Sequence, residues 1–152
     1  MKKVAGALRE ERVSKKRKPM LLSKFVGVDK RNTDKLASMG IEDVEQMLKL
    51  GRTREGRQEL VRQSGLEEVI ILKFVKLSDL ARIHGVKNIH TRLYHDAGFD
   101  TIEKMAQWDP VELREMLIKF AERTKFDGMA PMPKEALCTV EAAKKLPIIL
   151  EY

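Results

Sequence analysis

Apolar residues recur at helical spacing along most of the chain, and glycine and proline divide the pattern into short segments. Ile89, Leu93 and Ala97 lie four residues apart, which places them on one face of a helix that we expect to end at Gly98. No stretch alternates apolar and polar residues for long enough to indicate a β-strand. The pattern therefore predicts an all-α fold.

Two further helices are indicated by residues that favour helix N-termini. Asp100 and Glu103 form an Asp-x-x-Glu pair, in which the aspartate is expected to cap the helix that follows. Asp109 and Glu112 repeat this pair, with Pro110 at the first helical position, which proline favours. We therefore expect one helix to begin just after Asp100 and another just after Asp109.

The segment 67–76 is apolar at most positions, because six of its ten residues are valine, isoleucine, leucine or phenylalanine. A helix with so little polar surface should be buried, so we place it at the centre of the fold. Directly after it, Ser78 is expected to cap a separate helix that contains Leu80 and Ile83 and ends at Gly85.

The chain repeats part of its own sequence at an offset of 58 residues. We therefore expect two related units, near residues 22–65 and 78–122, that share one core and are joined by the buried helix at 67–76. The aligned pairs include Gly27 with Gly85, Thr33 with Thr91, Gly40 with Gly98, and Met47 with Met105.

Positive charge is concentrated at the start of the chain. The net charge is +7, and residues 1–18 contain eight lysines and arginines against two glutamates, so the remainder is almost neutral. We expect residues 1–19 to be a basic, flexible tail. The tail is interpreted as solvated and disordered, and steering of the protein toward phosphate or toward an acidic partner is an open alternative. Residues 20–152 should form a single helical domain, in which a last helix near 134–146 docks onto the core.

Composition indicates a soluble, cytoplasmic protein. Hydrophobic residues make up 43% and charged residues 35% of the chain, which is typical of a globular domain. No apolar run approaches the roughly 20 residues that span a bilayer, and no apolar signal segment follows the first basic residues, so no membrane association is expected. Cys138 is the single cysteine, so neither an internal disulfide nor a cysteine-based zinc site is expected.

The turn before the helix around Leu93 is the feature most open to a functional interpretation. Its sequence, Ile83-His84-Gly85-Val86-Lys87, resembles the helix-hairpin-helix motif. The resemblance implies that backbone amides at the start of the second helix hold a nucleic-acid phosphate, because unpaired N–H groups and the helix dipole favour an anion there. Such binding is salt-sensitive and does not read the base sequence. The candidate nucleic-acid-binding residues are His84, Gly85, Val86, Lys87, Asn88 and Arg92.

Several short stretches of residues 20–152 carry a wider resemblance to a known family. They are Gly56 to Leu60, Leu72 to Val75, Asp79 to Ile83, Ala97 to Thr101, and Ala143 to Pro147 with the final Glu151-Tyr152. With these runs, residues 20–152 resemble an uncharacterised family of tandem helix-hairpin-helix domains of unknown function. The resemblance implies a compact all-α fold and offers no established activity.

Two positions differ from the usual Gly-x-Gly hairpin of nucleic-acid-binding motifs. Lys87 and Asp29 stand where the second glycine would fall, and a Cβ atom there can crowd a phosphate. Asp29 also adds a negative charge, so the hairpin Gly27-Val28-Asp29 is interpreted as structural. Lys87 adds a cation, which makes the second hairpin the better phosphate site, while a purely architectural second hairpin is an open alternative.

The sequence contains no recognisable catalytic or metal site. His84, His90 and His95 are not spaced as i and i+4 ligands on one helix, so no metal or other cofactor is expected. The chain also looks too short for the additional helical domain of helix-hairpin-helix glycosylases, so we expect no enzyme and no small-molecule substrate. Two functions are considered: weak, sequence-independent binding of DNA or RNA through the second hairpin, and protein–protein interaction or scaffolding with structural hairpins.

Overall fold

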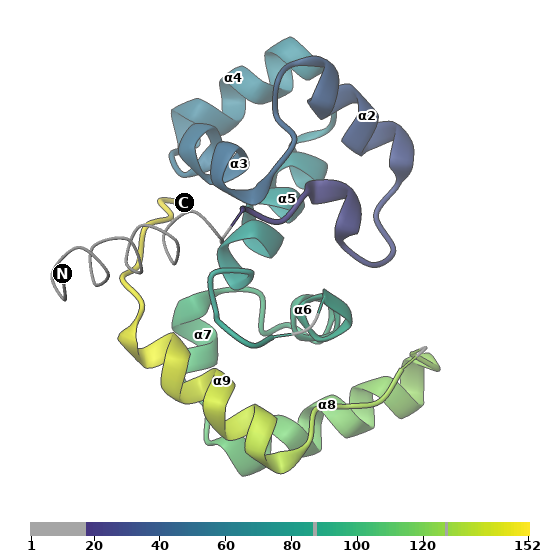
Figure 1. Cartoon of the computed structure of the whole chain (residues 1–152), viewed down its shortest axis with the longest axis vertical. Helices are drawn as coiled ribbons and strands as arrows, with labels where there is room; N and C mark the ends of the chain where they lie inside the picture. The colour runs from purple at the N-terminus through teal and green to yellow at the C-terminus, as the bar shows by residue number, and fades with distance from the viewer. Residues whose placement is uncertain (1–17, 87, 127) are drawn as a thin grey trace, which may run out of the picture.

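The computed structural model describes residues 18–86, 88–126 and 128–152, so most of the predicted basic tail lies outside it. The described residues form helices, and their only β contact is an isolated bridge between Leu21 and Asp43 (Figure 1), so the all-α prediction is confirmed. The elements are η1 (Leu22–Lys24), α2 (Lys30–Ser38), α3 (Val44–Gly51), α4 (Arg54–Ser64), α5 (Glu68–Leu80), α6 (Asn88–Asp96), α7 (Ile102–Gln107), α8 (Pro110–Thr124) and α9 (Pro133–Lys145).

Helix α5 is the central element of the fold, because it packs against α3 and α4 and also against α6. Ile71, Phe74, Val75 and Leu77 are each at most 2% exposed, whereas Val69 on the first turn is 66% exposed. The helix is therefore buried along most of its length but not at its start.

The predicted helix start at Ser78 is wrong. Helix α5 continues through Ser78 and ends after Leu80, and the serine is fully buried. Leu77 and Leu80 continue the apolar register of Phe74, and burying each leucine contributes about 1.5–3 kcal/mol, against about 1 kcal/mol for a serine cap. Burial therefore outweighs the local preference of serine. Within the described residues, the Ser78 hydroxyl has no hydrogen-bond partner.

The buried hydrophobic residues form two clusters, so the prediction of one shared core is wrong. The first cluster lies among η1, α2, α3, α4 and most of α5, and the second lies among the end of α5 and helices α6 to α9. Ile71 and Leu77 belong to the first cluster and Leu80 to the second. The short helices of each half bury their apolar faces against one another, and α5 joins the two groups (Figure 1).

Residues 21–47 of the first half correspond to residues 79–105 of the second half at an offset of 58. Helices α2 and α6 each contain nine residues, and their first residues are 58 positions apart. Gly27 and Gly85 have φ values of +75° and +82°, a conformation that other residues adopt only with strain. Backbone hydrogen bonds also recur at this offset. In the first half they run from amide to carbonyl as Lys24 to Leu21, Phe25 to Leu22, Gly40 to Ala37, Ile41 to Leu36 and Met47 to Asp43. The equivalent bonds of the second half are Arg82 to Asp79, Ile83 to Leu80, Gly98 to His95, Phe99 to Tyr94 and Met105 to Thr101.

The C-terminal segment returns to the first half of the molecule. Helix α9 packs against α7 and α8, and residues 146–152 then run back toward α5 (Figure 1). The amide of Glu151 donates to the carbonyl of Arg52 over 2.8 Å, and Leu150 is buried in the first cluster. The buried Arg57 also donates to the carbonyl of Glu151. The end of the chain therefore joins the two groups of helices.

Candidate nucleic-acid interface

The hairpin to which the sequence assigned phosphate binding connects α5 to α6. His84 and Gly85 are exposed, Val86 is partly buried against the second cluster, and Asn88 begins α6. Gly85 has φ +82°, and a Cβ atom on it would meet no other atom within 4 Å. The backbone conformation, rather than crowding, therefore requires glycine here. Lys87 lies outside the described residues.

Arg92 is engaged within the protein rather than at the exposed hairpin. Its Nε donates to Oδ2 of Asp96 over 2.5 Å, and its Nη1 donates to the carbonyl of Val26 over 2.8 Å. The side chain is only 19% exposed. The sequence prediction placed this guanidinium against phosphate, whereas the structure places it against the first hairpin. The pairing of Arg92 with Asp96 could be predicted from their i, i+4 spacing in the sequence. The contact of Arg92 with Val26 could not, because these residues are 66 positions apart.

Asn88 also holds the two hairpins together, because its side-chain amide donates to the carbonyl of Lys24 over 3.3 Å. On the first hairpin, a Cβ atom on Gly27 would lie 2.5 Å from Nη1 of Arg92. The approach of the arginine therefore adds to the positive φ in requiring glycine at this position. The structure brings the Gly27 and Gly85 hairpins side by side, an arrangement that the sequence did not predict.

The helix start after the first hairpin is occupied by a carboxylate of the chain itself. Oδ1 of Asp29 accepts a 2.9 Å hydrogen bond from the amide of Arg31, and the Arg31 guanidinium pairs with the same carboxylate. The bond from the Arg31 amide, followed by that from its side chain, lowers the pKa of Asp29. A phosphate at the start of α2 would meet this negative charge, so the geometry favours a structural role for the first hairpin.

Two lysines beside the first hairpin, Lys24 and Lys30, are exposed. Lys24 precedes Gly27, its side chain is exposed, and its main chain contacts Asn88. Lys30 is exposed at the first position of α2. The main chain at Lys24 therefore lies beside the start of α6, which follows the second hairpin.

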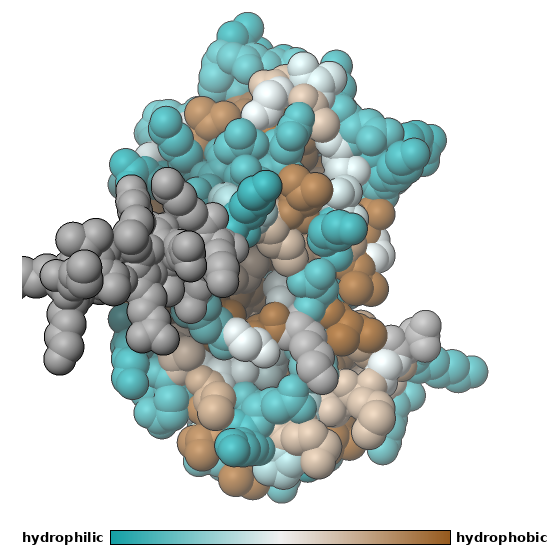
Figure 2. Space-filling view, in the orientation of Figure 1, coloured by the Kyte–Doolittle hydropathy of each residue, from teal (hydrophilic) through white to brown (hydrophobic). Residues whose placement is uncertain are grey.

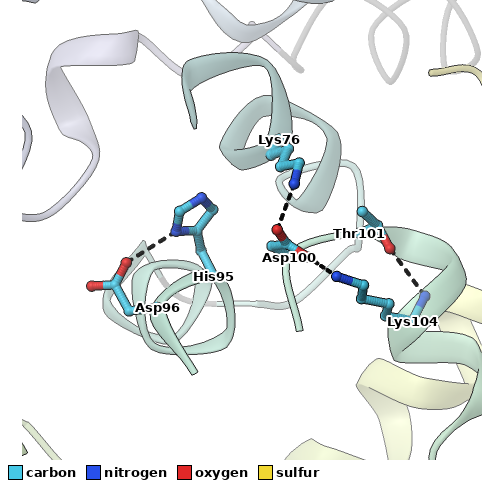
Figure 3. A network of polar contacts seen from close by, with 6 residues as sticks. All are labelled: Lys76, His95, Asp96, Asp100, Thr101 and Lys104. Atoms are coloured by element: carbon cyan, nitrogen blue, oxygen red, sulfur yellow. Dashed lines mark hydrogen bonds and ion pairs between the residues drawn. The ribbon is translucent and has the colours of Figure 1, made fainter. Parts of the chain in front are cut away.

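Asp100 is not the helix cap that the sequence predicted. Thr101 caps α7, since its hydroxyl accepts from the amide of Lys104 over 3.1 Å. Asp100 instead binds Lys76 of α5 over 2.6 Å and Lys104 over 2.8 Å (Figure 3). Burial raises the pKa of Asp100, but hydrogen bonds from Lys104 and Lys76 outweigh burial and hold the pKa below its ordinary value. Asp109, in contrast, caps α8 as predicted.

The three histidines lie in different surroundings. His90 is buried, with Nε2 3.0 Å from the carbonyl of Met129, and Nδ1 of His95 lies 3.0 Å from Oδ1 of Asp96 (Figure 3). His84 is exposed on the second hairpin. Among the residues that the structure describes, no three His, Cys, Asp or Glu side chains gather so that they could hold a metal ion.

Within the described ranges, no helix has the length and apolar character that crossing a membrane requires. A family model described as a domain of unknown function, DUF4332, matches residues 26–146. No curated protein and no solved structure matches the chain. The matched region includes both glycine hairpins and the paired helices that follow them.

Proposed function

The chain belongs to the DUF4332 family, whose function is unknown, so we infer its function from its own surface. We propose that it binds the phosphate backbone of nucleic acids at the Gly85 hairpin. The proposal rests on the exposed Gly85, which lies three residues before α6 with a positive φ and open space at its Cβ position. Amides at a helix start lack intrahelical acceptors and carry the positive end of the helix dipole. A phosphate oxygen can approach them here without meeting a side chain on Gly85.

We interpret residues 22–65 and 78–122 as tandem helix-hairpin-helix units, with α9 as a helix that docks on the second. The equal lengths of α2 and α6, their 58-residue offset and the positive φ of both hairpin glycines support this interpretation. The packing of α9 against α7 and α8 supports the docking role. Only the second unit is assigned to phosphate, because Asp29 fills the helix start of the first.

The proposed contacts are to phosphate and not to bases. Main-chain amides of the Gly85 hairpin form the anion site, Lys87 contributes a cation, and the exposed Lys24 adds attraction from the first hairpin. Arg92 and Asn88 are positioning residues, since their side chains bond to main-chain carbonyls of the first hairpin. Phosphate contacts carry no base information, so binding should be independent of sequence and should weaken as salt rises.

Fluorescence anisotropy with labelled DNA and RNA of several unrelated sequences, at low and moderate salt, tests this function. Lys87→Glu should weaken binding and reduce the slope of log affinity against log salt by about 1. Lys119→Glu is the matched control, because it makes the same charge change at an exposed position of α8. Removal of residues 1–18 should weaken binding further and leave the effect of Lys87→Glu in place.

If neither DNA nor RNA bound at low salt, the proposal would be wrong. Equal losses for Lys87→Glu and Lys119→Glu would also overturn it, because they would indicate attraction by net charge alone. If removal of residues 1–18 abolished binding while Lys87→Glu had no effect, the tail and not the hairpin would be the binding element.

A further inference from the structure

Two side chains of α6 hold the start of that helix to the first hairpin. Asn88, the first residue of α6, donates to the carbonyl of Lys24 over 3.3 Å. Arg92, four residues later, donates to the carbonyl of Val26 over 2.8 Å. Residues four apart lie on the same face of a helix, so the main chain of residues 24–26 runs along the first turn of α6. This turn is also the helix start at which phosphate binding is proposed.

Hydrogen bonds, rather than apolar packing, fix this junction. Val26 belongs to neither hydrophobic cluster and is 41% exposed. Figure 2 shows a mixture of hydrophilic and hydrophobic surface where the turn after η1 meets α6. Phe25, in contrast, is 3% exposed and anchors the first hairpin in the first cluster. The carbonyls that accept the two bonds are therefore held by the first group of helices.

Gly27 leaves room for the arginine of this junction. A Cβ atom at position 27 would lie 2.5 Å from Nη1 of Arg92, whereas a Cβ atom on Gly40, which has a similar positive φ, would meet no atom within 4 Å. Arg92 is not free to move aside, because its Nε also donates to Asp96 and its side chain is only 19% exposed. A side chain at position 27 would therefore act on the start of α6 through Arg92.

We infer that Gly27 is a positioning residue for nucleic-acid binding at the Gly85 hairpin and acts through the bond from Arg92 to the first hairpin. The inference rests on the proposed function, in which the first hairpin binds no phosphate because Asp29 occupies the start of α2. The role of the first hairpin is to hold the helix start that meets the phosphate. Hydrogen bonds weaken steeply when donor and acceptor are misaligned, so a shift of α6 weakens binding without removing a contact.

Fluorescence anisotropy of the full chain with labelled DNA and RNA, over a series of salt concentrations, tests the inference. Gly27→Asn adds a Cβ atom beside Arg92, and asparagine tolerates a positive φ better than most side chains do. Affinity should fall by about threefold to tenfold at every salt concentration. The slope of log affinity against log salt should stay the same, because no phosphate contact is lost. Lys87→Glu should reduce that slope, so the two variants separate positioning from contact.

Gly40→Asn is the matched control, because it makes the same change at a similar φ with no neighbour at the Cβ position. It should leave the affinity unchanged. In a chain that already carries Arg92→Ala, adding Gly27→Asn should weaken binding no further, whereas a general loss of stability would weaken it again. Urea unfolding of each variant, followed by circular dichroism, shows whether the chain is folded under the binding conditions.

Asn88→Ala tests the same junction if Gly27→Asn does not fold, since it removes the bond to the Lys24 carbonyl without a change of charge. Its affinity should fall while the salt slope stays the same. Equal losses for Gly27→Asn and Gly40→Asn, a further loss on adding Gly27→Asn to Arg92→Ala, or no loss for Asn88→Ala would overturn the inference.

The experiment also separates this inference from the function on which it rests. If Lys87→Glu weakens binding and Gly27→Asn does not, the proposed function stands and the positioning role of Gly27 is wrong. If the wild-type chain binds neither DNA nor RNA, both are wrong.

Discussion

Arg92 determines how the two glycine hairpins lie against each other. Its guanidinium bonds to the carbonyl of Val26 and to the carboxylate of Asp96, and it also fills the space beside Gly27. A partly desolvated cation needs such acceptors, because an unpaired charge in this position is costly. The arginine and the glycine therefore depend on each other, although they belong to different halves of the chain.

We expect Gly27→Ala and Arg92→Ala to be coupled in their effects on stability. The alanine Cβ would displace the guanidinium from its two acceptors, so Gly27→Ala should cost more when Arg92 is present than when it is absent. The double-mutant cycle in urea unfolding should give a coupling energy of about 0.5 kcal/mol or more.

Gly85→Ala provides the control for this cycle, because Gly85 has a similar φ and no neighbour at its Cβ position. Its cost should be the backbone strain alone, about 1–2 kcal/mol, whether or not Arg92 is present. Strict additivity of Gly27→Ala and Arg92→Ala would show that the two residues do not constrain each other.

Asp100→Asn should lower the free energy of unfolding at neutral pH and have less effect in acid. The folded-state pKa of Asp100 lies below its ordinary value of 3.8, despite burial, because Lys104 and Lys76 bind the carboxylate. Its stabilising contribution is therefore present above pH 3.8 and is lost as the pH falls through the lower folded-state pKa. Urea unfolding of both proteins across a pH series measures the difference.

Asp34→Asn, at an exposed position of α2, is the control for the pH series and should change the free energy of unfolding by no more than about 0.5 kcal/mol. A deficit of Asp100→Asn that stayed constant down to the acid end of the series would show that the carboxylate is not stabilised by its two lysines.

At the scale of elements, the C-terminal segment 146–152 is a structural part of the first group of helices. Leu150 is buried among η1 and α2 to α5, and the aromatic ring of Tyr152 lies 5.8 Å from the Arg57 guanidinium and 5.6 Å from Nζ of Lys76. Burial is the largest cause that raises the pKa of the Tyr152 hydroxyl to about 12. The segment therefore stabilises helices that are distant from it in sequence.

Leu150→Ala should destabilise the protein by about 2–3 kcal/mol, because it removes buried methyl groups from the first cluster. Ile148→Ala is the control on the same segment, since Ile148 is 62% exposed and its loss should stay within about 0.5 kcal/mol. Urea unfolding measures both variants. Equal effects at the two positions would indicate that the segment does not pack as described.

At the scale of the whole molecule, two hydrophobic clusters are joined by shared elements. Helix α5 contributes to both clusters, and the C-terminal segment leaves α9 in the second group and packs on the first. Arg82, which follows α5, donates to the carbonyl of Pro147 over 2.8 Å and adds a further link. Loss of one group of helices would therefore expose apolar surface of the other.

We expect the two groups to unfold in a single transition. Trp108 is the only tryptophan, and its ring packs edge-on against Phe99 in the second group, with ring centroids 5.1 Å apart. Tryptophan fluorescence therefore reports on the second group, whereas far-ultraviolet circular dichroism reports on all helices. Coincident urea transitions are expected. A fluorescence transition at a separate urea concentration would show that the two groups unfold independently.

The amino-acid sequence by itself determined the features that depend on neighbours within one or two helical turns. The all-α class follows from the apolar spacing, the start of α8 from Asp109 and Pro110, and the hairpin turn before α6 from Gly85. Capping, proline geometry and the tolerance of glycine for positive φ are local properties, so a short stretch of sequence contains the information. This local information identified the exposed part of the candidate site.

Only the tertiary structure decided the contacts between residues that are far apart in sequence. Arg92 turns from the candidate site to the Val26 carbonyl, Asp100 binds Lys76 instead of capping α7, and Ser78 stays inside α5. Contacts between distant residues also explain why residues 146–152 pack on the first group of helices and why the buried residues form two clusters. In each case burial and charge pairing against a distant partner outweigh a local preference of about 1 kcal/mol, and the sequence pattern does not show where that partner lies.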